Sequence, residues 1–162
     1  MGYTHYMTQK KRFPKAEWAT IQADVIAVLD AASAAGIAIG DSHGELILFN
    51  HAEAFFDTET GPQCMFNGLG DDAHETMAFS RDVQPVEWSG QRKGWSFCKT
   101  AQKPYDVAVT AVLVYLESVY PQCLSVGSDG VPADWQAGLE LARKALPRLA
   151  DVLRIPAEVT AE

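Results

Sequence analysis

The sequence contains few cysteines, and their spacing argues against two classes of small protein. Cys64, Cys98 and Cys123 are spread over 162 residues without a C-x-x-C pair. Disulfide frameworks use an even number of cysteines, and structural zinc sites commonly use closely spaced pairs. We therefore expect neither a disulfide scaffold nor a zinc knuckle, and the expected location is a reducing cytoplasm.

Long apolar runs are also missing. The most apolar stretch, residues 107–116, is much shorter than the roughly 20 residues that cross a bilayer. The basic residues near the N-terminus are not followed by the apolar segment of a secretory signal. The sequence therefore predicts no membrane partner.

Positive charge is in deficit. Lysine and arginine number 13 against 21 aspartates and glutamates, which gives a net charge of -8. Proteins that hold nucleic acid through its phosphates need the opposite balance, so nucleic acid is not an expected partner. The 48% of hydrophobic residues is enough for a core, and the length predicts a single domain over 1–162 with a frayed tail at 156–162.

Hydrophobic periodicity predicts the elements in the first half of the chain. Alternation over residues 2–8 indicates a strand, with Tyr3, His5 and Met7 on one face. A helix should run from Pro14 to Gly36 because apolar residues recur there at three- and four-residue spacing. Turn-rich sequences separate further predicted strands, which are a hairpin of 37–39 with 45–49, then 63–67, 76–79 and 95–100.

The second half of the chain contains the most apolar predicted helix. Residues 104–120 are apolar on most of the helix circumference, so this helix should be central and buried. A short strand is expected at 123–126 and a third helix around Trp135, ending at Pro147. Together these elements predict an α+β fold with one mostly antiparallel sheet of about five or six strands, covered by two or three helices.

The segment 97–106 leads from a strand into the N-terminus of the central helix. Unpaired N–H groups at a helix N-terminus attract anions and lower the pKa of a nearby thiol. Cys98 is therefore the candidate nucleophile, and Lys99, Thr100 and Asp106 are candidate ligand-binding residues. The alternative is a buried, inert Cys98 beside a surface lysine, with Thr100 or Asp106 capping the helix.

The segment 66–77 carries a second group of polar residues. Its Gly68-x-Gly70-x-x-Ala73 spacing imitates a dinucleotide loop, but a strand rather than a helix is predicted to follow, so no cofactor is expected. His74 and Glu75 are candidate catalytic residues for acid/base chemistry, and Asn67 is a candidate ligand-binding residue. Only one of His74 and Glu75 should face inward, and the alternative is a solvated turn.

Metal chemistry has little support in the sequence. The four histidines are scattered without H-x-x-x-H spacing, so no metal site is predicted, although distant His and Asp residues could still converge. His5, which shares one face of the first strand with Tyr3 and Met7, is added to the candidate ligand-binding residues. Ser128, Asp129 and Gly130 indicate a turn rather than part of a Ser/His/Asp triad.

Several segments resemble an uncharacterised group of small bacterial and phage proteins that begin MGYTHY. The similarity is carried by residues 1–6, 66–68, 74–77 and 97–106. The resemblance implies no activity. It implies that the opening strand, the Asn67-Gly68 turn and the Cys98–Thr100 segment are the places to look for a shared site.

Two hypotheses of function follow. The first is a small-ligand-binding or enzymatic site at strand ends, built from His5, Asn67, His74 or Glu75, and residues 98–100. The second is an acidic protein-interaction module, such as a phage or prophage accessory protein that binds a host factor, which only the charge of -8 supports.

Overall fold

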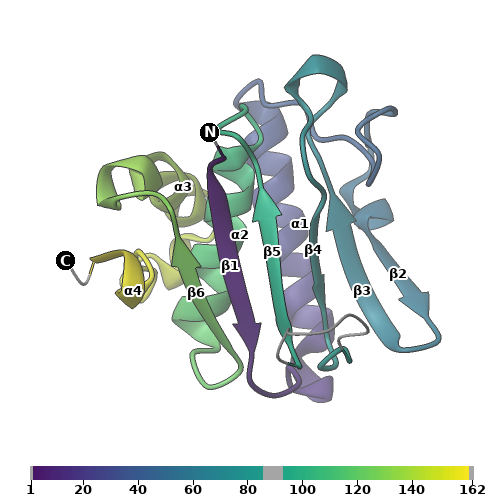
Figure 1. The fold of residues 1–162 in the computed structure, drawn as a ribbon, viewed down its shortest axis with the longest axis vertical. Coiled ribbons are helices and arrows are strands. Elements are labelled where there is room, and N and C mark those ends of the chain that lie inside the picture. The colour runs from purple at the N-terminus through teal and green to yellow at the C-terminus, as the bar shows by residue number, and fades with distance from the viewer. Residues whose placement is uncertain (1, 86–92, 161–162) are drawn as a thin grey trace.

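A computed structural model describes residues 2–85 and 93–160 of the chain. The fold is α+β, with six described strands in two antiparallel sheets of three strands each. Helices cover one face of these sheets, and the opposite face is left open (Figure 1). The predicted fold class is confirmed, but the expectation of one sheet of five or six strands is wrong.

The first sheet has the order β5-β1-β6, and its strands are β1 (Thr4–Gln9), β5 (Trp95–Lys99) and β6 (Leu124–Ser128). Strand β1 is central and antiparallel to both neighbours, so His5 lies opposite Cys98 on one side and opposite Ser128 on the other. The inner face of β1 carries the buried His5 and Met7, whereas Tyr6 is exposed on the outer face. The alternation predicted for this strand is therefore confirmed.

The second sheet has the order β2-β3-β4, and its strands are β2 (Phe55–Thr58), β3 (Gly61–Phe66) and β4 (Met77–Ser80). Strand β2 was not predicted. The predicted hairpin of 37–39 with 45–49 is confirmed only as a short antiparallel contact, in which the Leu48 N–H donates to the Ile39 carbonyl, and neither segment forms a strand. That region forms only isolated bridges from Gly40 to Ile47 and to Asn67. Gly40 packs so closely on the backbone of Gly68 that a Cβ there would lie 2.2 Å from the Gly68 oxygen, which favours a compact loop over a strand pair.

The helices are α1 (Trp18–Ala34), α2 (Asp106–Val119), α3 (Pro132–Ala145) and the short α4 (Ala157–Thr160). Every residue of α2 from Ala108 to Leu116 is buried, as the sequence predicts for a central helix. Helix α3 approaches α2 closely because Gly138 packs against Thr110. No helix in the described residues is long and apolar enough to cross a membrane.

The tail that we expected to be frayed, 156–162, contains a helix in its described part. Residues 157–160 form α4, which packs beside β6 and buries Val159. Burial of Val159 contributes to holding this short helix against the sheet. The position of Trp88 between the polar residues Glu87 and Ser89 predicts an exposed side chain, but Trp88 lies outside the described residues.

The burial of α2 predicts the effect of shortening one of its side chains. Leu113 is fully buried, so Leu113→Ala should lower the free energy of unfolding by about 2 to 5 kcal/mol through lost burial and a residual cavity. The exposed Val152 offers a control, because Val152→Ala should change stability by less than about 0.5 kcal/mol. Urea denaturation measures both, and a loss below about 1 kcal/mol at Leu113 would contradict the buried position.

Candidate functional site

Three candidate ligand-binding residues meet in one buried polar cluster. His5 Nε2 lies 2.6 Å from Asp106 Oδ1, and the Thr100 hydroxyl donates to the same carboxylate oxygen over 2.6 Å. On the other side of the ring, His5 Nδ1 lies 2.9 Å from Ser128 Oγ. The cluster therefore joins β1, β6, the end of β5 and the start of α2.

A tight turn brings Asp106 beneath Thr100. Ala101 and Gln102 both have positive φ angles, 52° and 56°, and the Lys103 N–H donates to the Thr100 carbonyl. Left-handed backbone is unfavourable for residues other than glycine, so the contacts around this turn must hold it in place. The bond from Thr100 to Asp106 is one of those contacts.

The cluster has the composition of a Ser/His/Asp triad but a different hydrogen-bond arrangement. With its hydrogen on Nε2, the His5 imidazole donates to Asp106 and accepts the Ser128 hydroxyl hydrogen at Nδ1. The N–H of Gly130 and the indole N–H of Trp135 both donate to Ser128 Oγ. A nucleophilic oxygen needs a free lone pair, and both lone pairs of Ser128 are occupied.

The surroundings of His5 also favour a structural role. Its ring is completely buried and makes edge contacts with the rings of Tyr3 and Trp135. The polar hydrogens of His5, Thr100 and Ser128 each have an acceptor, whereas the buried Tyr3 hydroxyl beside them has no hydrogen-bond partner among the described residues. The bonds of the cluster connect strands to helices. We interpret the cluster as the polar contact that fixes the first sheet onto α2 and α3.

Cys98 lies beside this cluster, on the inner face of β5. Its side chain is fully buried, its thiol points to the Glu75 carbonyl, and desolvation together with the charge of Glu75 raises the pKa of the thiol to about 12. The structure places the thiol in a closed environment that disfavours the thiolate. Of the two interpretations that the sequence left open, burial favours the inert cysteine.

The remaining predicted site residues fasten the loop before β4 to the end of β5. The Glu75 carboxylate accepts the Lys99 N–H over 2.7 Å, and the exposed His74 ring donates from Nδ1 to the Lys99 carbonyl. Asn67 is buried, and its side-chain amide bonds to both the N–H and the carbonyl of His74. These residues thus lie together, but their polar atoms bond to the chain itself.

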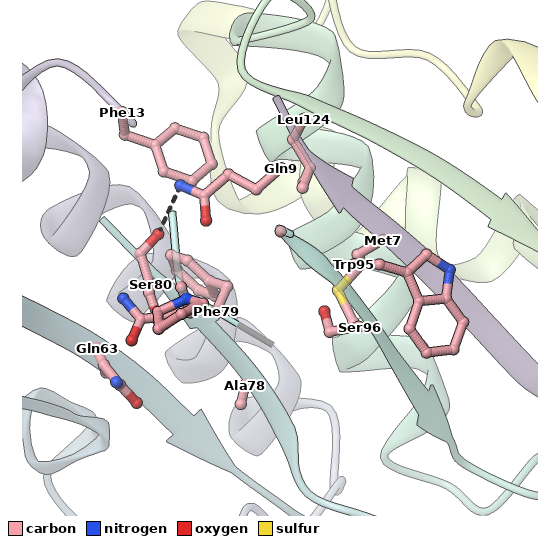
Figure 2. Close-up of a pocket in the computed structure, with 13 residues that line it drawn as sticks. Met7, Gln9, Phe13, Gln63, Ala78, Phe79, Ser80, Trp95, Ser96 and Leu124 are labelled. Atoms are coloured by element: carbon pink, nitrogen blue, oxygen red, sulfur yellow. Dashed lines mark hydrogen bonds between the residues drawn. The ribbon is translucent and has the colours of Figure 1, made fainter. Parts of the chain in front are cut away.

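A hollow opens elsewhere, between the two sheets. We call it the intersheet slot; it measures about 220 Å³ and lies between β4 and β5, and β1 contributes Met7 and Gln9 to its lining. Figure 2 shows its lining residues, which are Met7, Gln9, Phe13, Gln63, Ala78, Phe79, Ser80, Gln84, Pro85, Gly94, Trp95, Ser96 and Leu124. None of these described residues carries a charge.

The lining of the slot includes residues from the inward-facing positions of β1 and β5. Ser96 lies opposite the buried Met7 and therefore faces inward, yet its side chain is exposed. Gln9 reaches across from β1 and donates through Nε2 to the carbonyls of Ser80 and Arg81, as the dashed line in Figure 2 shows for Ser80. A side-chain amide thus occupies the place where a neighbouring strand would otherwise pair with β4.

Sequence reasoning missed the slot residues because glutamine, serine and alanine form no catalytic motif. One signal was present, since Gln9 continues the inward face of β1 after His5 and Met7. A glutamine at an inward position needs hydrogen-bond partners, and this indicates a polar feature inside the fold. In the described part of the chain, no group of three or more His, Cys, Asp or Glu residues is placed to hold a metal ion.

The cluster around His5 predicts a specific loss of stability. Thr100→Val keeps the shape of the side chain but removes the hydroxyl that donates to Asp106, and it should lower the free energy of unfolding by about 1 to 3 kcal/mol. Thr8→Val, on the outer face of β1, is the matched control and should change stability by no more than about 0.5 kcal/mol. Equal effects in urea denaturation would contradict the role of the cluster.

The environment of Cys98 predicts its reactivity. At pH 7 a thiol with a pKa of about 12 is almost entirely protonated, so Cys98 should resist iodoacetamide in the native protein. Cys64 and Cys123 are also buried with raised pKa values, and all three should label together once the protein is denatured. Native labelling of Cys98, located by peptide mass spectrometry, would restore the nucleophile hypothesis.

We compared the chain with known protein families, curated proteins and solved structures. No protein-family model matches the chain, and no curated protein or solved structure matches it either. The resemblance to proteins that begin MGYTHY stays a prediction, and function must be inferred from the geometry of the chain's own residues.

Proposed function

We propose that this protein binds a small, uncharged ligand in the intersheet slot. The observation that carries the proposal is a hollow of about 220 Å³ whose described lining combines apolar side chains with amides and hydroxyls. Small-molecule sites are typically concave and mostly apolar, with a few polar groups that orient the ligand. A hollow of this size suits a ligand of one or two rings.

The lining supports binding rather than catalysis. The described residues of the slot include no aspartate, glutamate, histidine, cysteine, lysine or arginine. Acid/base and nucleophilic chemistry needs such groups at the ligand. The candidate catalytic residues Cys98, His74 and Glu75 are not among the lining residues, so their proposed chemistry would require a different site.

The same lining selects against charged ligands. A charged group that leaves water for this slot loses its hydration, and the described lining residues offer it no ion pair. The hydroxyls of Ser80 and Ser96 can donate and accept neutral hydrogen bonds instead. The Gln84 amide nitrogen already donates to the carbonyls of Thr60 and Asp82, so this side chain offers its oxygen as an acceptor. Neutral molecules that have both an apolar ring and a polar edge fit this combination.

A fragment screen with a blocking variant tests the proposal. Ligand-observed NMR should detect binding of some neutral ring compounds to the wild-type protein, and Ala78→Tyr should abolish it because the added ring fills the slot from β4. Ala34→Tyr, the same substitution at an exposed position of α1, should retain binding. Ser96→Leu blocks the slot from β5 and replaces Ala78→Tyr if that variant does not fold.

Two outcomes would overturn the proposal. One is that no neutral fragment binds the wild-type protein. The other is that the same fragments bind the wild-type protein and a folded slot-blocking variant equally well, because they would then occupy a different surface. Circular dichroism establishes that each variant is folded before it is screened.

A further inference from the structure

The backbone of β5 directs unpaired groups into the intersheet slot. Both backbone groups of Lys99 point toward the β4 side, since its N–H donates to the Glu75 carboxylate and its carbonyl accepts from the Glu75 N–H. The N–H and C=O groups of an extended strand point to alternate edges, residue by residue. Trp95 and Phe97 therefore direct their backbone groups toward the same side as Lys99.

The directions of the backbone groups of β4 follow from the same alternation. The Arg81 N–H donates to the Pro62 carbonyl, so Phe79 and Met77 point their backbone groups toward β3. Ser80 and Ala78 then point theirs toward β5. The Ser80 carbonyl accepts from Gln9, in agreement with this direction.

These two edges do not pair with each other. In the described residues, no backbone hydrogen bond joins β4 to β5, and the adjoining segments are joined only beyond the strand ends, from Glu75 to Lys99 and from Gly94 to Gln84. Ala78 on one edge and Trp95 on the other are both slot residues. Their N–H and C=O groups are therefore available to whatever occupies the slot.

The slot is closed at both ends. At one end the Glu75 N–H donates to the Lys99 carbonyl, and at the other the Gly94 N–H donates to the Gln84 carbonyl. An extended peptide that added as a strand between β4 and β5 would have to pass through both ends. The closed ends favour a small molecule over a polypeptide.

Resting on the proposed function, we propose that the ligand is a flat, uncharged heterocycle. It carries a hydrogen-bond donor next to an acceptor on one edge of the ring, as a lactam does, and this edge binds to the backbone of Ala78 or Trp95. Such an edge pairs with the N–H and C=O of one strand residue. The side chains of Met7 and Phe79 face inward and that of Trp95 faces outward, so apolar groups lie on both sides of a ring held in the plane of the strands.

A matched pair of probes tests the donor and acceptor requirement. We expect 2-quinolinone, a bicyclic lactam, to bind at least about tenfold more tightly than N-methyl-2-quinolinone, which has the same ring system without the N–H donor. One hydrogen bond to an otherwise unpaired carbonyl accounts for a difference of this size. Titrations followed by ¹⁵N–¹H correlation spectra measure both affinities on the full chain.

The same spectra locate the bound probe. The backbone amide signals of Ala78 or Trp95 should move with 2-quinolinone, and the shifts should disappear in Ala78→Tyr or Ser96→Leu but persist in Ala34→Tyr. Equal affinity for the two probes, or no shift at either amide, would overturn the inference. If other neutral fragments still bind in the slot, the proposed function survives that result; if none does, both proposals fail.

Discussion

The fold depends on the burial of helix α2 on all sides, because this helix has no polar face over most of its length. Each residue from Ala108 to Leu116 is buried, and leaving any side of this helix in water would expose a large apolar area. Helix α3 covers one side through the close approach of Gly138 to Thr110, α1 lies alongside, and the first sheet covers the front (Figure 1). The hydrogen bonds among His5, Asp106 and Ser128 then hold that sheet in place against the helices.

The division into two sheets has a local cause at Glu75. Its N–H pairs with Lys99, as in an antiparallel ladder, but its own carbonyl accepts from the hydroxyl of Tyr105 and from the thiol of Cys98. The Glu75 carbonyl therefore bonds to side chains inside the fold, and the Glu75 carboxylate accepts the Lys99 N–H in its place. Pairing between β5 and β4 stops there, and at the opposite end Gln9 bonds to β4 with its side chain.

This arrangement separates the chemically distinctive residues from the space that a ligand could fill. Cys98, Glu75 and His5 hold elements together, and their polar atoms are satisfied within the chain. The interruption of the ladder leaves a slot whose described lining side chains carry no charge and in which no backbone bond joins the described residues of β4 and β5. The residues that break the sheet are therefore the ones that create the proposed binding site, although they do not line it.

The sequence by itself determined the central helix, the inward face of β1 and the α+β class, because these follow from periodic burial along one segment. It also placed polar residues at 5, 67, 98–100 and 106 near strand and helix ends, as the structure has them. Only the tertiary structure decided that β4 and β5 do not pair. That outcome depends on competition for the Glu75 carbonyl by Tyr105 and Cys98, which are 30 and 23 residues away in sequence. No local pattern encodes such a long-range contact, so neither the second sheet nor the slot between the sheets could be read from the sequence alone.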